Sequence, residues 1–139
     1  MKVLIADLFS AVAIMEMQGA GMEVTFNKDL AGETLTQALK DLSPEILVVR
    51  STKVQVEQID ANPKLQLVVR AGAGTDKIDV AHCSRKGIYV ANCPGKNSNA
   101  VSELTVGLML SIDRRMAEGN QMLHAGEWNK AMFSKCKGV

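Results

Sequence analysis

The sequence lacks the features that mark several functional classes. Aromatic residues make up only 4% of the 139 residues, too few to stack against nucleic-acid bases. The formal net charge is +1, so no strong positive field attracts a phosphate backbone. No apolar run reaches the ~18 residues of a membrane-spanning helix, and the short apolar start meets Asp7 too soon for a secretory signal. We therefore expect no nucleic-acid partner, no membrane partner and a cytoplasmic location.

Ligands for metals and pairs for disulfides are also scarce. The three cysteines, Cys83, Cys93 and Cys136, are odd in number and far apart, and no Cys-x-x-Cys pair occurs. The two histidines, His82 and His124, do not have the spacing of metal ligands on a helix. We expect neither a disulfide framework nor a metal site.

Two nucleotide-binding signatures are missing as well. The glycine fingerprint Gly-x-Gly-x-x-Gly begins at Gly72 and Gly74, but Lys77 occupies the place of its third glycine. No Gly-Lys-Ser/Thr phosphate loop occurs, and no histidine or carboxylate is obviously paired with an arginine as acid or base. By its residues alone, the chain is expected to lack catalytic machinery.

The apolar residues, 47% of the chain, alternate between strand-like and helix-like patterns. Strands are predicted at residues 2–7, 23–26, 46–49, 65–69 and 88–91. Helices or helical turns are predicted at residues 10–20, 33–42, 54–61 and 80–86. This alternation is typical of a parallel sheet covered by helices. We predict an α/β fold with a flavodoxin-like, five-stranded parallel sheet.

The pattern changes after residue 98. Residues 100–122 form one long helical pattern, for which Ser98 or Asn99 is the predicted N-cap. One stripe of this helix is apolar and contains Val101, Leu104, Leu108 and Ile112. Such a helix either ends an ordinary domain, links to a second domain or forms a dimer contact. A polar tail from residue 126 onward holds the only tryptophan, Trp128.

Two arginines follow apolar strands and mark a candidate binding site. Arg50 and Arg70 end neighbouring strands of the predicted sheet, at the edge where open α/β sheets bind ligands. Ser51 and Lys53 follow the first arginine, and the glycines of residues 72–74 leave backbone N–H groups accessible after the second. We predict an anion site here. The alternative is that each arginine only caps its strand and meets solvent.

Other polar residues near this edge allow two interpretations. Asp7 ends the first strand and either faces the site or caps the chain locally. The loop from Asn92 to Asn97 either orders a ligand or turns the chain. Asp76 is interpreted as a turn residue, and Asp79 as the N-cap of the following helix.

Five short motifs occur in an order typical of one known family. They are residues 50–54, 65–79, 85–88, 92–94 and 97–105. Together they resemble the amino-terminal part of the D-isomer-specific 2-hydroxyacid dehydrogenases, and the likeness is densest from Arg50 to Trp128. The resemblance implies a substrate-binding domain of flavodoxin-like fold at residues 1–98. It also implies that residues 99–139 form a linking helix and the start of a Rossmann domain that binds NAD.

The resemblance implies specific roles at the sheet edge. The substrate side of the cleft would be lined by Arg50, Ser51 and Lys53. The carboxylate of a small anionic substrate would be held by Arg70, Ala71, Gly72, Ala73 and Gly74. In addition, Ala73 would approach the nicotinamide of the NAD cofactor, and Asn97 would lie at the interdomain entrance. The helix after Asn99 and the His-x-Gly-x-Trp run at residues 124–128 would form a surface between copies in a homo-oligomer.

The implied reaction of the complete enzyme is the NAD-dependent oxidation of 3-phosphoglycerate to 3-phosphohydroxypyruvate in serine biosynthesis. One alternative is a glyoxylate, hydroxypyruvate or other 2-hydroxyacid dehydrogenase. Another is a non-catalytic, co-repressor-like protein that senses NAD. A phospho-receiver domain is disfavoured, because Leu8 stands where an acidic pair is needed and Arg50 ends the third predicted strand.

Two departures from the family pattern affect these expectations. The family often has one more residue between the Arg-Ser and Thr-Lys pairs, which affects the register of Lys53. The chain also ends at Val139, before the family's glycine fingerprint and its catalytic arginine, glutamate and histidine. We therefore expect no catalytic residue in this chain, and a fragment that binds substrate without dehydrogenase activity of its own.

Overall fold

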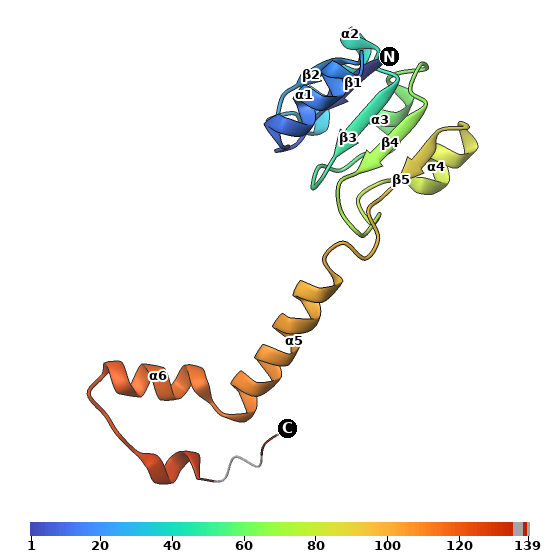
Figure 1. Ribbon diagram of the computed structural model, residues 1–139. Helices are drawn as coiled ribbons and strands as arrows, with labels where there is room; N and C mark the ends of the chain where they lie inside the picture. Colours follow the sequence, from blue (N-terminus) through green and yellow to red (C-terminus); the bar gives the residue numbers. More distant parts are fainter. Residues whose placement is uncertain (135–137, 139) are drawn as a thin grey trace. The chain divides into compact units, whose positions relative to one another are not determined.

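A computed structural model describes residues 1–134 and 138 (Figure 1). These residues divide into two units, Met1–Lys96 and Asn97–Val139, and each is described by itself. Cys136, one of the three cysteines considered above, lies outside the described residues.

The first unit alternates five strands with four helices. The strands are β1 (Lys2–Ile5), β2 (Glu23–Phe26), β3 (Ile46–Val49), β4 (Leu67–Arg70) and β5 (Tyr89–Ala91). The helices are α1 (Ala11–Gly19), α2 (Gly32–Leu42), α3 (Val56–Asp60) and α4 (Val80–Arg85). All strands pair in parallel, in the order β2-β1-β3-β4-β5. The predicted α/β fold with a five-stranded parallel sheet is confirmed.

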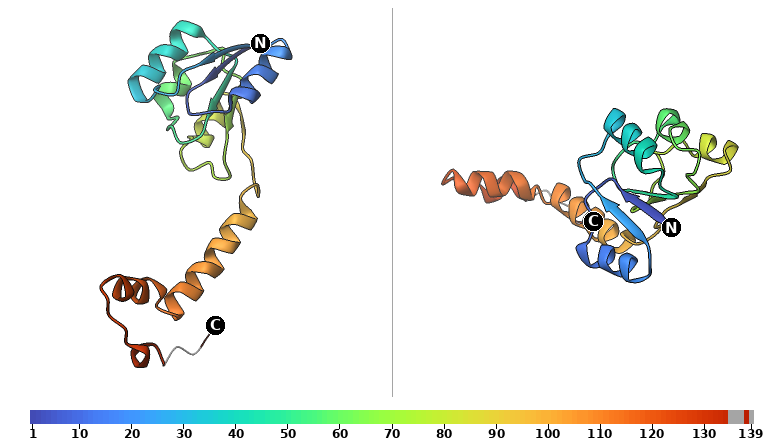
Figure 2. Two further views of the ribbon diagram at one scale, coloured as in Figure 1. Left: turned by 60° about the vertical axis from the view of Figure 1, so that its left-hand side comes forward. Right: turned by 90° about the horizontal axis from the view of Figure 1, so that it is seen from above.

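The sheet has a helical layer on each face. Helices α2, α3 and α4 cover one face and α1 covers the other (Figure 2). Successive side chains of a strand point to opposite faces, so Leu4, Leu47 and Val68 join the larger apolar cluster under α2 to α4. Val3, Ile5 and Val48 form the smaller cluster on the side of α1. Burial on both faces explains why these strands are continuous apolar runs in the sequence.

The starts of two helices in the first unit follow the sequence closely. Ser10 is the N-cap of α1, and its side chain accepts a hydrogen bond from the Ala13 N–H. Asp79 is the N-cap of α4, as predicted, and its carboxylate accepts a hydrogen bond from the His82 N–H at 2.8 Å. Caps of this kind satisfy backbone donors that a helix leaves unpaired at its first turn.

In the second unit, the prediction of one long helix is wrong. The segment is divided into α5 (Ser98–Asp113) and α6 (Met116–His124), followed by a 3₁₀ helix at Lys130–Phe133. Arg115 lies between them with a φ of +50°, which ends the regular helix. Its guanidinium donates to Glu118 and lies 5.4 Å from the centre of the Phe133 ring, two contacts that favour this geometry.

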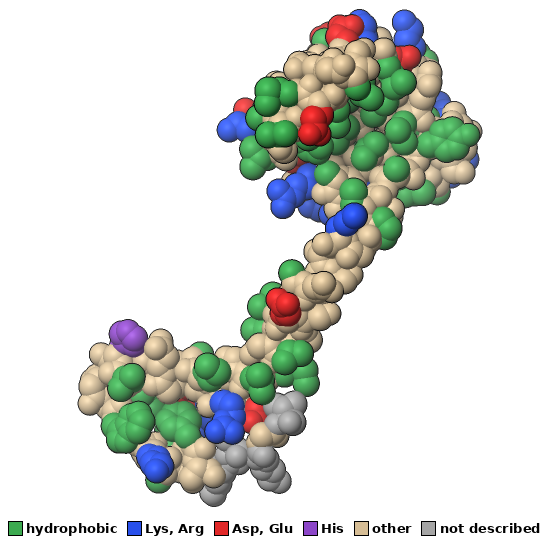
Figure 3. Space-filling model, in the orientation of Figure 1, with side chains coloured by type: hydrophobic (Ala, Val, Ile, Leu, Met, Phe, Trp, Pro, Cys, Tyr) green, Lys and Arg blue, Asp and Glu red, His purple; other side chains and the backbone are tan. Residues whose placement is uncertain are grey.

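The N-cap prediction for α5 is also wrong. Asn97 precedes the helix, rather than Ser98 or Asn99, and its side chain makes no capping hydrogen bond. Hydrophobic side chains lie exposed along α5 (Figure 3). No helix within residues 1–134 is long and apolar enough to span a membrane.

Candidate anion-binding site

The ends of β3 and β4 bring the two predicted arginines to the same edge of the sheet. The strands are neighbours, and the register pairs Val49 with Arg70. Arg50 therefore lies one residue beyond the position opposite Arg70. Arg50 is exposed and Arg70 is partly buried. Lys53, three residues after Arg50, is also exposed.

The segment after β3 is held by a single carboxylate. Asp7, which follows β1, accepts hydrogen bonds from the backbone N–H groups of Arg50, Ser51 and Thr52 at 2.7, 3.0 and 3.0 Å. It also accepts a hydrogen bond from the Ser51 hydroxyl at 2.8 Å. Burial of this carboxyl acts to raise its pKa, but these hydrogen bonds outweigh burial and lower the pKa from 3.8 to about 2. Asp7 is therefore ionised at neutral pH.

These contacts clarify the interpretation of Asp7 and show the hydrogen-bond partner of Ser51. Asp7 lies at the sheet edge and binds the backbone that carries Arg50. It therefore combines the two alternatives considered from the sequence, facing the site and capping the chain. The Ser51 hydroxyl, predicted to line the substrate cleft, donates a hydrogen bond to Asp7. Its role toward a substrate stays a prediction.

Arg70 folds back over the glycine-rich loop that follows it. A Cβ atom placed on Gly72 would overlap the Arg70 guanidinium, so a larger residue here would displace the Arg70 side chain. A Cβ atom on Gly74 would lie 2.9 Å from Oδ1 of Asp76. Within the described part of the chain, Nε of Arg70 is buried and has no hydrogen-bond partner. A buried donor without an acceptor is rare, and an anion is the kind of ligand that would satisfy it.

The backbone of this loop is only partly available to a ligand. The Ala71 N–H donates to the Val49 carbonyl at 2.7 Å, and the Gly72 N–H donates to the Arg70 carbonyl at 2.8 Å. Among residues 1–134, the N–H groups of Ala73 and Gly74 have no hydrogen-bond acceptor. The predicted site of four residues, 71–74, thus offers two available backbone donors.

The loop after β5 fixes the glycine-rich loop from its other side. Nδ2 of Asn92 donates to the Ala73 carbonyl at 2.6 Å, and the Cys93 N–H donates to the Gly72 carbonyl at 3.0 Å. With their carbonyls held in this way, the peptides of the loop have a defined orientation. The sequence marked Asn92 as either a ligand-ordering or a turn residue, and its contact with Ala73 lies 19 positions away in the chain.

The predicted site residues of the first unit are brought together. The carboxyl edge of the sheet, where the carboxyl ends of its strands lie, carries Arg50, Ser51, Lys53 and residues 70–74. Asn97 belongs to the second unit, where it precedes α5. In the part of the chain that the structure describes, no group of three or more histidine, cysteine or acidic side chains is placed to hold a metal.

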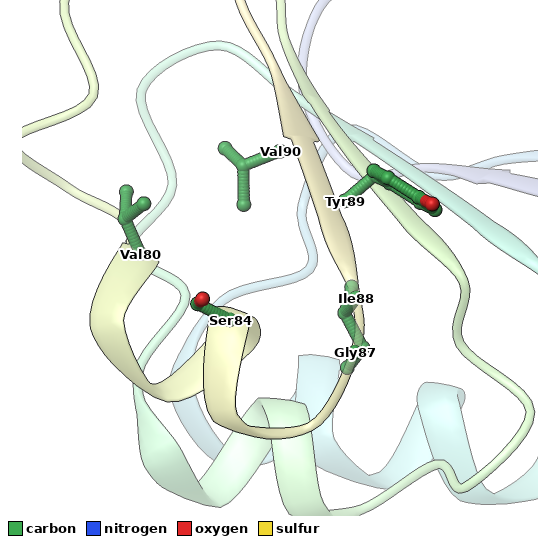
Figure 4. A pocket seen from close by; sticks show the side chains of 6 residues that line it. All are labelled: Val80, Ser84, Gly87, Ile88, Tyr89 and Val90. Atoms are coloured by element: carbon green, nitrogen blue, oxygen red, sulfur yellow. The ribbon is translucent and has the colours of Figure 1, made fainter.

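An open pocket lies elsewhere in the first unit. It measures about 360 Å³ and lies between α4 and β5. The side chains of Val80, Ser84 and Val90 face its interior, whereas Tyr89 points away from it (Figure 4). No charged side chain lines the pocket. Because its lining has no charged group, this pocket offers an anion less than the sheet edge does.

Comparison with known proteins identifies the family. Residues 3–135 match the family described as "D-isomer specific 2-hydroxyacid dehydrogenase, catalytic domain". The chain is 40% identical over 139 residues to a D-3-phosphoglycerate dehydrogenase of Methanocaldococcus jannaschii, an alignment that covers 99% of this chain and 25% of that protein. It is also 40% identical over 110 residues to a hydroxypyruvate reductase of Thermotoga maritima, covering 78% of this chain and 35% of the relative.

A solved structure agrees with these relatives. The NAD⁺-bound 3-phosphoglycerate dehydrogenase of Entamoeba histolytica superimposes with a TM-score of 0.67 at 36% identity, covering 80% of this chain and 38% of that one. The present chain spans about a quarter of the length of the curated phosphoglycerate dehydrogenases that it matches. On the family match, which extends over nearly the whole sequence, the chain belongs to the D-isomer specific 2-hydroxyacid dehydrogenase family.

Proposed function

We propose that this chain is the substrate-binding part of an NAD-dependent dehydrogenase that oxidises 3-phosphoglycerate at C2. The carboxyl edge of the sheet carries the proposal, because it gathers donors suited to a substrate with two anionic groups. Arg50 and Lys53 are exposed cations, and the N–H groups of Ala73 and Gly74 are unpaired within residues 1–134. Family membership and the identity to phosphoglycerate dehydrogenases support the same substrate.

Each group has a distinct task in this proposal. Arg50 and Lys53 bind the phosphate, since charge-assisted hydrogen bonds to phosphate are stronger than neutral ones. The N–H groups of Ala73 and Gly74 donate to the substrate carboxylate, and the Arg70 guanidinium adds positive charge beside them. No residue of this chain is assigned a proton-transfer step.

NAD, when bound, accepts the hydride released from C2 of the substrate. Few residues of this chain are suited to contact NAD. Ala73 and Gly74 are exposed and carry almost no side chain, so a flat ring can approach their backbone closely. We propose a contact between Ala73 and the nicotinamide. The cytoplasmic location and the place in serine biosynthesis stay predictions.

A second copy of this protein is the proposed partner of α5. The exposed apolar side chains on this helix include Val101, Leu104, Leu108 and Ile112. Exposed apolar patches of this kind mark contact surfaces. Sedimentation equilibrium of the purified chain tests the association, and Leu104→Glu is expected to shift the protein to monomer. A mass independent of concentration and equal to one chain would contradict it.

The identity to a hydroxypyruvate reductase favours a second candidate, a reductase of an unphosphorylated 2-oxo acid. The two candidates differ in whether the phosphate contributes to binding. Isothermal titration calorimetry with 3-phosphoglycerate, D-glycerate and hydroxypyruvate separates them. We expect 3-phosphoglycerate to bind at least about tenfold more tightly than D-glycerate, since the two ligands differ only in the phosphate.

Variants show which residues provide this difference. Arg50→Gln and Lys53→Gln should each reduce the preference for 3-phosphoglycerate, because each removes a cation from the phosphate. Lys64→Gln is the matched control, since Lys64 is an exposed lysine in the loop preceding β4. Equal affinities for 3-phosphoglycerate and D-glycerate would favour the reductase. The absence of binding to all three ligands would overturn the anion site itself.

A further inference from the structure

Asp7 is a buried, charged side chain to which the proposed reaction assigns no role. It is only 9% exposed, yet it lies at the same edge of the sheet as the cations of the anion site. Its two oxygens accept four hydrogen bonds, three of them from the consecutive N–H groups of Arg50, Ser51 and Thr52. Three consecutive N–H groups converging on one carboxylate define the course of the backbone, much as a helix cap does.

The segment that Asp7 holds is also fixed at its far end. The Val54 N–H donates to the Lys77 carbonyl at 2.9 Å, and Val54 forms an isolated parallel bridge with Ile78. In addition, the Thr52 hydroxyl donates to the Ala6 carbonyl at 3.4 Å. Arg50 and Lys53 therefore project from a short segment whose backbone is held at both ends, although both side chains are exposed.

A carboxylate near an anion site would normally weaken binding through like-charge repulsion. At Asp7 the four donors offset the negative charge, and the same hydrogen bonds keep the carboxyl ionised. The arrangement restrains the backbone of the loop, so less conformational freedom is lost when a ligand binds. This advantage applies to groups on the loop after β3 and not to the glycine-rich loop after β4.

We propose that Asp7 is a positioning residue that presents Arg50 and Lys53 to the phosphate of the substrate without contacting the substrate itself. This inference rests on the proposed function and deepens it, because it assigns the phosphate-binding half of the site to a loop organised by β1. This inference predicts different effects on the two anionic groups of the substrate. Loss of the Asp7 carboxylate weakens recognition of the phosphate and leaves recognition of the carboxylate nearly unchanged.

The test compares two ligands on one variant. Asp7→Asn keeps the size of the side chain but removes its charge, so the charge-assisted hydrogen bonds from the N–H groups of Arg50, Ser51 and Thr52 become weaker neutral ones. By calorimetry, we expect the Kd for 3-phosphoglycerate to rise about tenfold and the Kd for D-glycerate to change less than about twofold. Asp79→Asn is the matched control, because Asp79 also accepts a backbone N–H, at the start of α4. It should leave both affinities unchanged.

A double-mutant cycle identifies the residue through which Asp7 acts. If Asp7 positions Arg50, then adding Asp7→Asn to Arg50→Gln should weaken 3-phosphoglycerate binding by far less than Asp7→Asn does in the wild-type chain. Full additivity, or an equal loss of affinity for both ligands, would show that Asp7 has only a general structural role. An unchanged affinity for both ligands would equally overturn the proposal.

Two further measurements separate failure of this proposal from failure of the proposed function or of folding. Binding by the wild-type chain tests the proposed function separately, because it does not depend on any Asp7 variant. If Asp7→Asn does not fold, as judged by circular dichroism, Ser51→Ala replaces it, since this change removes one of the four donors to Asp7. The expected result is a loss of several-fold for 3-phosphoglycerate alone. No change, or an equal loss for D-glycerate, would overturn the proposal.

Discussion

The two units of this chain use similar apolar residues in opposite ways. In the first unit, Leu4, Leu47 and Val68 are fully buried beneath helices of the same unit. In the second, the described residues of α5, α6 and the 3₁₀ helix include no buried residue, and Leu104 is 63% exposed. Apolar periodicity predicts a helix in either case but does not reveal what covers it. The first unit forms its own core, whereas the second presents an apolar surface.

The residues of the candidate site are also unevenly divided between the two units. Its cations, its unpaired backbone donors and Asp7 all belong to the first unit, and only Asn97 belongs to the second. A rigid, self-contained sheet edge can hold functional groups in fixed positions, since residues at strand ends are oriented by the packed strands behind them. The following predictions test this contrast, from the largest expected effect to the smallest.

The largest contrast concerns leucine truncation. Leu47→Ala removes a fully buried side chain from the central strand β3 and should lower the free energy of unfolding by about 3–4 kcal/mol. Leu104→Ala on α5 should change it by less than about 0.5 kcal/mol, because the side chain is exposed. Urea denaturation followed by circular dichroism measures both at low protein concentration. Equal effects would show that α5 is packed as tightly as β3.

The second prediction concerns acid unfolding. The folded-state pKa of Asp7 lies below 3.8, so Asp7 contributes stability above about pH 4, and this contribution is lost as the pH falls toward 2. A shift from 3.8 to about 2 corresponds to on the order of 2 kcal/mol. Stability measured by urea denaturation across this range should decline less steeply in Asp7→Asn than in wild type. Glu103→Gln on α5 serves as the control, and an identical pH profile for wild type and Asp7→Asn would contradict this account.

The third prediction concerns the contact that orients the glycine-rich loop. Asn92→Ala removes the hydrogen bond to the Ala73 carbonyl and should weaken D-glycerate binding about fivefold, corresponding to about 1 kcal/mol. Calorimetry provides the measurement. Asn120→Ala on α6 replaces an exposed asparagine of the second unit and should leave the affinity unchanged. A loss of the same size in both variants would remove Asn92 from the site.

The smallest effect compares two non-glycine residues with positive φ. Ser43 has a φ of +45° at the end of α2, and Arg115 has a φ of +50° before α6. Ser43→Gly should raise the free energy of unfolding by less than about 1 kcal/mol, since glycine adopts this conformation without strain but loses the exposed hydrogen bond from the Ser43 hydroxyl to the Lys40 carbonyl. Arg115→Gly should give no gain, because it also removes the contacts with Glu118 and Phe133. A gain in both variants would mean that those contacts contribute little.

Much of the fold was predictable because its signals are local. The strands β3 and β4 are short apolar runs, and an arginine follows β3 and ends β4. Pro44 and Gly87 mark turns that precede β3 and β5. The break at Arg115 was not predictable, since no proline or glycine stands there and the apolar pattern continues on both sides. Helix patterns alone do not show where tertiary contacts end a helix.

The site was predicted in composition but not in detail. The arginines and glycines at the strand ends are visible in the sequence, and parallel pairing brings them together. The one-residue offset between Arg50 and Arg70 depends on strand register, which pairing across the sheet decides. The contacts of Asp7 with residues 50–52 span more than 40 positions, and no local pattern reports such a contact.

The most direct test of the anion site is an NMR titration of the ¹⁵N-labelled chain with 3-phosphoglycerate. The account predicts that the largest amide shift changes occur at Arg50 to Lys53 and at Ala73 and Gly74, with little change in α5 and α6. Changes centred on the pocket between α4 and β5, or on the second unit, would contradict the assignment of the substrate site to the carboxyl edge of the sheet.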